Sequence, residues 1–318
     1  MLRLYGRPGK LWVVCFQSAG RYMVSFVLVI ITQFALALVP RLLPASSLFL
    51  QLLLSVVVLL LVVGFGRCCR RLLRVSASAP ALVLFNTLFV WGVYFVDVRP
   101  AVPRLVDVTF NGEIALLFIG LFRILSSDPG FMSNGVPGTA AELVETGALA
   151  TEVHDESDVL PLRVRYCKSC KSYVKGFDHH CPAFGNCIGY KNHALFMVLL
   201  AGFLATEGSY VVFSFHVAKG YWVLRQYKFQ SDLARSLVVS TMLFSLLQVL
   251  WQVFFLTWHI YCIFFNIRTD EWINWKKYPE FYFTTQPEPG ESTTVMRFKN
   301  PYNKGIVPNL REFLGMKT

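Results

Sequence analysis

The sequence predicts an α-helical multi-pass membrane protein with about six transmembrane helices and a small cytosolic, zinc-bound, cysteine-rich loop domain. Hydrophobic residues make up 55% of the 318 residues and charged residues only 15%, which is too apolar for a soluble domain of this length. The apolar residues form runs of about 20, the length that a helix needs to cross a hydrocarbon core of ~30 Å. Four cysteines and two adjacent histidines lie instead in one polar stretch, between Cys167 and Cys187.

Five of the apolar runs are long and free enough of charge to predict transmembrane helices. They cover residues 22–39, 48–66, 80–96, 193–216 and 237–265. A sixth run, residues 108–125, is interrupted by Glu113 and Arg123. We expect this run to span as well, with both charges near the membrane interfaces, where long side chains reach toward water.

Basic residues predict which side of the membrane each segment faces. They precede the first run (Arg3, Arg7, Lys10, Arg21), follow the second (Arg67, Arg70, Arg71, Arg74) and recur in the C-terminal tail. The positive-inside rule makes these segments cytosolic, so with six spans both termini and the cysteine-rich loop face the cytosol. The loop at 219–236 is also basic, although this topology puts it on the lumenal side. We accept this conflict with the rule, because the first helices usually determine the orientation of the whole chain. Residues 1–21 lack the apolar core of a cleavable signal peptide, so the first run predicts a signal anchor.

The chain therefore divides into six consecutive segments. They are an N-terminal cytosolic segment with two helices (1–79), a helix pair (80–125), an acidic linker (126–160), the cysteine-rich domain (161–192), a second helix pair (193–265) and a cytosolic tail (266–318). The charge of the chain reverses at the start of the cysteine-rich domain.

This basic stretch begins with Arg163, Arg165, Lys168 and Lys175. A basic face around a reactive site would suit the phosphates of a cosubstrate, and it would equally suit a surface lying on anionic membrane lipid. No motif that reads nucleic acid accompanies these charges, so we expect no nucleic-acid partner.

The cysteine-rich stretch offers more ligands than one metal needs. A cytosolic site keeps its cysteines reduced, so disulfides are not expected. A closed structural zinc site takes four Cys or His ligands and commonly begins with a Cys-x2-Cys pair. Cys167 and Cys170 form such a pair, Cys187 fits a distant ligand, and one further ligand must come from residues 179–181.

The choice of that ligand decides which residues remain free. If His180 binds the metal, its neighbours His179 and Cys181 are both released, and a free cysteine beside a free histidine suggests a nucleophile and its base. On spacing alone, the alternative in which His179 and Cys181 bind the metal stays open.

Asp178-His179-His180-Cys181, in a loop between membrane spans, resembles the signature of the DHHC protein S-acyltransferases, also called palmitoyltransferases. Four further stretches resemble motifs of this family: Asp128-Pro129-Gly130 (DPG), Cys181-Pro182 with Asn186-Cys187 and Asn192 (CPxxxNCVGxxN), Arg268-Thr269-Asp270-Glu271 (TTxE, with Arg268 for the first threonine) and Asn300-Pro301-Tyr302 with Asn309 and Phe313. The resemblance runs from about residue 80 to about residue 314. The first two helices lie outside the family's usual four-helix core.

The resemblance implies an enzyme that transfers a fatty acyl group, usually palmitoyl, from acyl-CoA to cysteines of juxtamembrane or lipid-anchored substrate proteins. Cys181 would be the nucleophile, His179 its base and Asp178 the acid that orients the base. One structural zinc would be held by Cys167, Cys170, His180 and Cys187. A cytosolic active loop is compatible with a Golgi, endoplasmic reticulum or plasma membrane location, and the sequence leaves an accessory subunit open.

Further residues depart from the family pattern. Tyr166 and Tyr173 stand where the family has ligands of a second zinc, and the upstream Cys-x2-Cys pair is absent, so we expect that site to be lost. Without its metal, the stretch 151–165 should be looser or packed in another way. Ala183 replaces the tryptophan that follows Cys-Pro, which leaves the acyl-chain preference open.

Two other classes of function compete with the enzyme. A membrane-anchored zinc-binding adaptor, or a pseudoenzyme that binds client proteins, would keep the zinc ligands but have no need of His179 or Cys181. A transporter would explain Glu207, an acid within the fifth span, but would leave the cysteine-rich stretch without a role.

Overall fold

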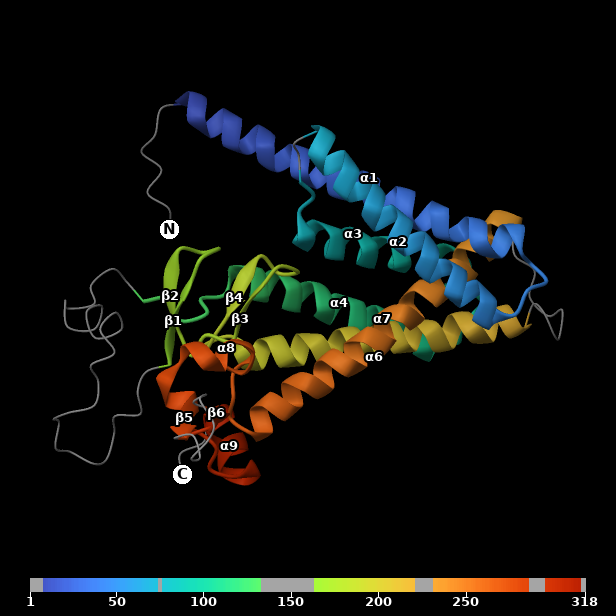
Figure 1. The fold of residues 1–318 in the computed structure, drawn as a ribbon. Coiled ribbons are helices and arrows are strands. Elements are labelled where there is room, and N and C mark those ends of the chain that lie inside the picture. The colour runs from blue at the N-terminus through green and yellow to red at the C-terminus, as the bar shows by residue number, and fades with distance from the viewer. Residues whose placement is uncertain (1–7, 74–75, 133–162, 221–230, 286–294, 316–318) are drawn as a thin grey trace. The chain divides into compact units, whose positions relative to one another are not determined.

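The computed structural model describes residues 8–73, 76–132, 163–220, 231–285 and 295–315. Its described part is dominated by long helices (Figure 1). These are α1 (Pro8–Leu42), α2 (Leu48–Leu73), α3 (Ala79–Val93), α4 (Arg104–Ser126), α6 (His193–Lys219) and α7 (Asp232–Phe264). A π-turn (Tyr94–Val98) and a 3-10 turn (Arg99–Ala101) extend α3 toward α4.

Each long helix contains a stretch that is apolar and long enough to cross a membrane, and these stretches run over 23 to 33 residues. Between 11% and 44% of the residues in their most apolar windows are buried inside the protein. Most of the apolar side chains therefore face outward, among them Leu60, Leu61 and Leu116, which are 67–70% exposed. Exposure of so large an apolar surface is unfavourable in water but favourable in lipid. The chain is an integral multi-pass membrane protein, and all six predicted spans are confirmed.

The interrupted span at 108–125 lies within α4. Its acid Glu113 accepts a hydrogen bond from Ser209 of α6 at 3.3 Å, so one carboxylate oxygen is satisfied inside the helix bundle. The first span differs from the prediction at its start: α1 begins at Pro8, ahead of the apolar run that begins at residue 22. The helix therefore continues beyond the part of its sequence that is apolar.

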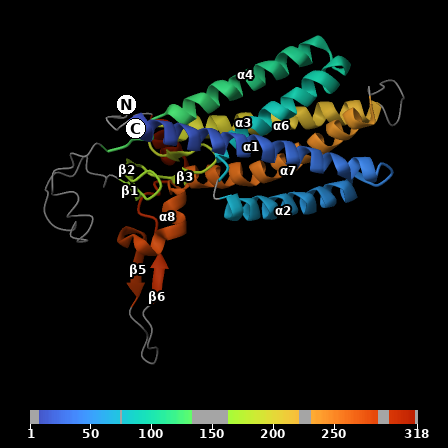
Figure 2. The same ribbon diagram turned by 90° about the horizontal axis from the view of Figure 1, so that it is seen from above.

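The chain packs as two compact units. Unit 1 comprises Met1–Ile119, Pro182–Phe184 and Ala201–Val253. Within it α1 packs along both α2 and α3 (Figures 1 and 2). Its core is aromatic and aliphatic; the rings of Tyr94 and Phe110 lie 4.2 Å apart at its centre.

Unit 2 comprises Gly120–Cys181, Gly185–Leu200 and Phe254–Thr318. It is built from three antiparallel hairpins and short helices. The hairpins pair β1 (Val164–Cys167) with β2 (Ser172–Lys175), β3 (His179–Cys181) with β4 (Asn186–Ile188), and β5 (Tyr282–Thr285) with β6 (Val295–Phe298). The short helices are α8 (Thr269–Asn274) and α9 (Ile306–Phe313). The first two hairpins carry the cysteine-rich stretch.

The end of α4 is tied to these hairpins by side-chain amides. Asn186 Nδ2 donates to the carbonyl oxygens of Ile124 and Ser127, both at 2.9 Å. Ile124 lies in the last turn of α4, whose carbonyls have no intrahelical donors, and Ser127 directly follows the helix. A Cβ at Gly189 would clash with the carbonyl oxygen of Pro129, so only glycine lets the Asp128-Pro129-Gly130 segment come this close to the hairpin.

The end of α7 is closed in the same way by the C-terminal segment. Asn309 Nδ2 donates to the carbonyl oxygen of Phe264 at 2.7 Å, and Asn300 Nδ2 donates to that of Phe265 at 2.6 Å. The asparagines of the C-terminal motif therefore satisfy carbonyls that the helix leaves unpaired.

Candidate metal centre and reactive cysteine

Three thiols and one imidazole gather in unit 2 in a group that could hold a metal ion. The ligand atoms of Cys167, Cys170, His180 and Cys187 all lie within 4.8 Å of one another. His180 Nδ1 is 3.7, 3.4 and 3.6 Å from the three sulfurs in that order. Zinc with bonds of ~2.3 Å to sulfur and ~2.0 Å to nitrogen needs ligand atoms about 3.5 to 3.8 Å apart in a tetrahedron. The four residues fit such an ion.

The groups in this site differ in protonation state, and only that of His180 suits a cation by itself. Burial, with the neighbouring thiols, raises the pKa of Cys187 above its ordinary value. Burial likewise raises the pKa of Cys170. Burial, together with charge on His179, lowers the pKa of His180 and keeps its imidazole neutral, the form that binds metal. A cation among the thiols would favour their thiolate forms and remove the cost of packing them together.

Strand geometry separates the two adjacent histidines. His179, His180 and Cys181 form β3, and successive side chains of a strand point to opposite faces. His180 pairs across the hairpin with Cys187, another member of the metal group. His179 and Cys181 are two residues apart and so share the other face. The structure thus gathers His180 with the three cysteines and puts His179 beside Cys181.

His179 is held on its far side by a carboxylate. Its Nδ1 lies 2.7 Å from Oδ2 of Asp178, which leaves Nε2 as the nitrogen available to the thiol of Cys181. Burial lowers the pKa of His179, but the hydrogen bond with Asp178 and the interaction with Cys181 outweigh burial and raise it to about 9. The arrangement is that of a nucleophile, a base and an orienting acid.

Asp178 is fully buried and held from several sides. Its second oxygen, Oδ1, accepts a hydrogen bond from the backbone N–H of Thr269 at 3.0 Å. Its own carbonyl oxygen accepts one from the N–H of Asp270 at 2.9 Å. Burial raises the pKa of Asp178, but His193, His179 and His259 hold it well below its usual range. The residue is therefore an anion that receives hydrogen bonds from the start of α8.

Three residues near this carboxylate were missed by sequence reasoning. Nδ1 of His259 lies 3.9 Å from Oδ2 of Asp178, and its ring packs 5.6 Å from that of His179. Arg268 donates from Nη1 to Nδ1 of His193 at 2.6 Å. His259 lies in α7, beyond the whole of α6, whereas His193 directly follows the cysteine-rich stretch as the first residue of α6. The only signal was that each is a histidine in an otherwise apolar helix.

Asp178, His193 and His259 form a second group close enough to hold a metal ion. Their contacts favour a hydrogen-bond cluster instead. Asp178 already accepts from His179 and from the N–H of Thr269, and the guanidinium of Arg268 lies at the nitrogen of His193. A fixed positive charge at a ligand atom opposes the binding of a cation.

Arg163 and Arg165 are engaged by protein groups. Arg163 donates to Asn266 and pairs with Glu271 at 2.9 Å, and both side chains of this pair are buried, at 10% and 1% exposure. Arg165 pairs with Glu280 at 2.6 Å. Their guanidinium groups also stack over the rings of Tyr302 (3.7 Å) and Tyr278 (3.9 Å). Both arginines thus join β1 to the segment that follows α7.

Lys168 and Lys175 are exposed, unlike the two arginines. Lys168 lies between the two cysteines of the Cys-x2-Cys pair, and Lys175 ends β2 with its Nζ 5.5 Å from the ring centre of Tyr190. Their ammonium groups are open to solvent at the surface of the cysteine-rich hairpins.

Tyr166 and Tyr173 form a cross-strand pair. They are directly opposite in the β1–β2 register, and their ring centres lie 5.1 Å apart in an edge-to-face arrangement. An aromatic pair of this kind contributes about 0.5–1.5 kcal/mol beyond its buried area. Ring packing therefore occupies the place where the family pattern has metal ligands. Most of the stretch 151–165, for which we predicted looser packing, lies outside the described residues.

Comparisons with known proteins agree with the motif reading. Residues 155–276 match the family model described as DHHC palmitoyltransferase. Palmitoyltransferase ZDHHC17 of Mus musculus is 27% identical over 225 residues, which cover 65% of this chain and 33% of that protein. Palmitoyltransferase ZDHHC13 of Homo sapiens is 25% identical over 255 residues, covering 74% and 39%. Palmitoyltransferase AKR1 of Mortierella alpina is 51% identical over 55 residues, covering 17% and 10%.

The chain spans about a third of the length of the ZDHHC17 proteins that it matches. The matched segment begins before β1 and ends in the 3-10 turn Trp275–Lys277 that follows α8, so it contains the metal group, Cys181 and the residues around Asp178. Residues 155–276 thus match the DHHC palmitoyltransferase family, in a chain that also has six apolar helices long enough to cross a membrane.

Proposed function

We propose that this protein is a protein S-acyltransferase that carries a fatty acyl group, most often palmitoyl, on Cys181. One observation carries the proposal: His179 shares a strand face with Cys181 and is hydrogen-bonded to the buried carboxylate of Asp178 at 2.7 Å. A protein that only binds zinc or client proteins has no use for this arrangement. The four candidate zinc ligands fit a metal ion, which supports the same function.

The reaction needs two transfers of the acyl group. In the first, His179 accepts the proton of the Cys181 thiol, and the sulfur attacks the thioester carbonyl of acyl-CoA. The bond from that carbonyl to the CoA sulfur breaks, and CoA leaves with the proton from His179. In the second, His179 accepts the proton of a substrate cysteine, whose sulfur attacks the acyl-Cys181 thioester. Cys181 then leaves as a thiol after receiving that proton.

Asp178 keeps the imidazole in the productive state through both transfers. Its carboxylate accepts a hydrogen bond from Nδ1, so that Nε2 faces the thiol and the charged imidazole is stabilised when it forms. The N–H of Thr269 in turn holds the other carboxylate oxygen.

A zinc ion bound by Cys167, Cys170, His180 and Cys187 would stabilise the two hairpins and leave no open coordination position. The metal ligands thus position β3, on which Cys181 and His179 lie.

The phosphates of CoA need cationic partners at the protein surface. Of the four basic residues predicted for this task, Lys168 and Lys175 are exposed, whereas Arg163 and Arg165 are paired with acids. We assign the phosphate contact to the two lysines and a positioning task to the two arginines. The acyl chain would enter the membrane, because burial of each of its CH2 groups is favourable by ~0.8 kcal/mol.

The substrates would be membrane proteins with juxtamembrane cysteines or proteins that already carry a lipid anchor. The basic loops favour a cytosolic site, with both termini on the same side, in a Golgi, endoplasmic reticulum or plasma membrane. This function is compatible with an accessory subunit.

Transfer to a peptide tests the proposal. The purified chain is mixed with palmitoyl-CoA and a myristoylated peptide that contains one cysteine, and the peptide's mass is followed. Wild type should add one palmitoyl group to the cysteine peptide and none to a peptide with serine in its place. Failure to modify the peptide with zinc-loaded protein and with palmitoyl-CoA intact would favour the adaptor function.

A further inference from the structure

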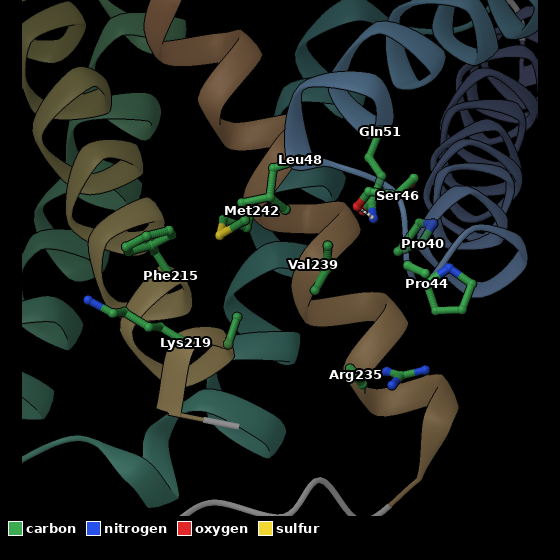
Figure 3. A pocket seen from close by; sticks show the side chains of 12 residues that line it. Pro40, Pro44, Ser46, Leu48, Gln51, Phe215, Lys219, Arg235, Val239 and Met242 are labelled. Carbon is green, nitrogen blue, oxygen red and sulfur yellow. Dashed lines mark hydrogen bonds between the residues drawn. The ribbon is translucent and has the colours of Figure 1, made fainter. Parts of the chain in front are cut away.

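The described structure contains charged groups that the proposed acyl transfer does not use. Two of them, Lys219 and Arg235, line a cavity of about 370 Å³ in unit 1 (Figure 3). They lie on opposite walls with their charged ends pointing apart, so the described lining brings no two cations together. The guanidinium of Arg268 in unit 2, in contrast, contacts a buried imidazole close to Asp178.

Arg268 holds His193 through one ring nitrogen. Its Nη1 lies 2.6 Å from Nδ1 of His193, the first residue of α6. A guanidinium can only donate hydrogen bonds, so Nδ1 is the acceptor and carries no proton. The single ring proton of the neutral imidazole is therefore on Nε2. A charged imidazole, with protons on both nitrogens, would turn a donor toward the guanidinium and cannot make this contact.

Both partners of this contact are held in place. The backbone N–H of Arg268 donates to Oε2 of Glu271 at 2.8 Å, and Glu271 is itself paired with Arg163. The His193 ring is buried and packs edge-on against the ring of Phe313, with 5.1 Å between the ring centres. The packing and the hydrogen bond together fix the orientation of the imidazole. The tautomer that Arg268 imposes therefore also determines where the ring N–H points.

His193 belongs to the group of side chains around the Asp178 carboxylate. A ring nitrogen of His193, a ring nitrogen of His259 and a carboxylate oxygen of Asp178 lie within 4.8 Å of one another. Oδ2 of Asp178 also lies 2.7 Å from Nδ1 of His179. A buried anion strongly attracts any positive charge that forms beside it. Three imidazoles thus compete for one carboxylate, but only that of His179 shares a strand face with Cys181.

We propose that Arg268 is a positioning residue, which keeps His193 neutral and thereby keeps the Asp178 carboxylate available to His179. This inference rests on the proposed acyl transfer. A charged His193 would form an ion pair with Asp178, and the carboxylate would then stabilise charge on His179 less during the transfer. The guanidinium prevents this, because it engages the lone pair that a second proton would need.

This arrangement is a departure from the family pattern. Arg268 stands where the TTxE motif has its first threonine. A threonine hydroxyl can either donate or accept a hydrogen bond, so it does not fix the protonation of a neighbouring histidine. An arginine can only donate, and it does. Threonine at this position would keep the backbone N–H that bonds to Glu271, so Arg268→Thr should leave the start of α8 folded.

The protonation of His193 can be measured by nuclear magnetic resonance of the full, zinc-loaded chain in detergent micelles, with isotope-labelled histidine. Correlations between ring protons and ring nitrogens distinguish a protonated nitrogen from an unprotonated one, and His193→Phe identifies the signals. At neutral pH, wild type should show an unprotonated Nδ1 and a protonated Nε2 at His193. Arg268→Thr should lose this state. Two protonated nitrogens in wild type, or identical His193 signals in the two proteins, would overturn the proposal.

Single-turnover acylation of Cys181 by palmitoyl-CoA measures the effect on the reaction. Arg268→Thr should lower the maximal rate at least about tenfold, which corresponds to ~1.4 kcal/mol. The concentration of palmitoyl-CoA at half-maximal rate should change little, because Arg268 acts on the base and not on the cosubstrate. Arg311→Thr, the same change at an exposed arginine of α9, is the matched control and should react as wild type does.

A double variant tests whether Arg268 acts through Asp178. Asp178→Asn already removes the carboxylate, so the addition of Arg268→Thr should cause no further loss of rate. Arg268→Lys keeps a cation that can only donate, and it should recover part of the rate that Arg268→Thr loses. Zinc content and thermal unfolding of each variant separate a slower reaction from a damaged fold. Losses that multiply in the double variant, or a wild-type rate in Arg268→Thr, would overturn the proposal.

Failure of this proposal and failure of the proposed function give different results. No acyl-enzyme in zinc-loaded wild type would refute the proposed function, whereas the spectrum would still decide the protonation of His193. Acylation of wild type with an unchanged rate in Arg268→Thr would refute the role of Arg268 alone.

Discussion

Asp178 joins the reactive histidine to the segment that follows the last membrane helix. One carboxylate oxygen lies 2.7 Å from Nδ1 of His179, and the other accepts the N–H of Thr269 at 3.0 Å. The carboxylate is completely buried, so both contacts act without competition from water. The TTxE-like motif thus helps to position His179, which we propose as the base, although the motif lies far from Cys181 in the sequence.

We predict that Asp178→Asn slows acyl-enzyme formation by about 10²–10⁴-fold, the range that a positioned base contributes. The amide keeps the shape of the side chain but cannot stabilise a charged imidazole, and its NH2 group would oppose Nδ1–H. Single-turnover labelling with palmitoyl-CoA measures the rate. Asp270→Asn, in the short helix α8 whose start contacts Asp178, is the control and should keep most of the rate. An unchanged rate in Asp178→Asn would remove the acid from the mechanism.

The two histidines should behave in opposite ways. His179→Ala is expected to keep its metal and lose acylation, because its side chain lies on the face of Cys181. His180→Ala is expected to lose the metal and much of the folded hairpin structure, because one of four ligands disappears. Atomic emission measures the bound metal, and acyl labelling measures the acylation, in each variant. The reverse pattern would mean that the roles of the two histidines are exchanged.

We expect about one zinc per chain. The four-residue group fits a tetrahedral ion, Tyr166 and Tyr173 pack together where a second site would need ligands, and Arg268 opposes a cation at His193. The ratio of zinc to protein in a purified, tag-free preparation measures this. Two zinc ions that both resist dialysis against a weak chelator would contradict the assignment.

Breaking the buried pair between Arg163 and Glu271 should be costly. Arg163→Ala leaves the Glu271 carboxylate buried without its partner, which typically costs ~3–5 kcal/mol of folding free energy. Arg165→Ala, two residues further along the chain, is the matched control, since its partner Glu280 is partly exposed and the pair is worth ~0–1 kcal/mol. Thermal unfolding of the two variants in the same detergent compares them. Equal losses of stability would mean that burial does not distinguish the two pairs.

The sequence predicted the membrane-spanning part well because the signal is long and repeated. Each helix presents about 20 apolar residues, and few other structures use such a run. Even the run broken by Glu113 was predicted correctly, although the reason differs in part: the acid is hydrogen-bonded to Ser209 within the bundle. The start of α1 was not predictable, because a helix can continue into polar sequence once it has begun.

Within the cysteine-rich stretch, spacing alone left two ligand sets open. Strand formation at 179–181 distinguishes them, since the alternation of side chains groups His180 with Cys187 and separates it from His179. A strand of three residues carries too little pattern to be predicted with its register. From charge alone, we predicted the same phosphate-binding task for the two arginines and the two lysines. The acids that pair with the arginines, Glu271 and Glu280, lie more than a hundred residues further along the chain, so the sequence did not show these ion pairs.

The same limit applies to His193 and His259. His259 is the single histidine of α7, with no neighbour in the sequence to suggest a site. His193 directly follows the cysteine-rich stretch, but its position in the sequence does not show that it contacts Arg268. Only the folded chain brings His259 to 3.9 Å from Asp178. Residues that support a site through long-range contacts leave no local pattern in the sequence. The candidate metal ligands, in contrast, follow a characteristic spacing along the chain.

The most direct test of the account is to locate the acyl group on the enzyme. The full chain is purified in detergent, incubated with radiolabelled palmitoyl-CoA and separated by non-reducing electrophoresis before and after hydroxylamine treatment. Wild type and Cys262→Ser should carry a hydroxylamine-sensitive label, and Cys181→Ser should carry none while keeping its zinc. Label that persists in Cys181→Ser, or its absence from zinc-loaded wild type, would contradict the assignment of Cys181 as the nucleophile.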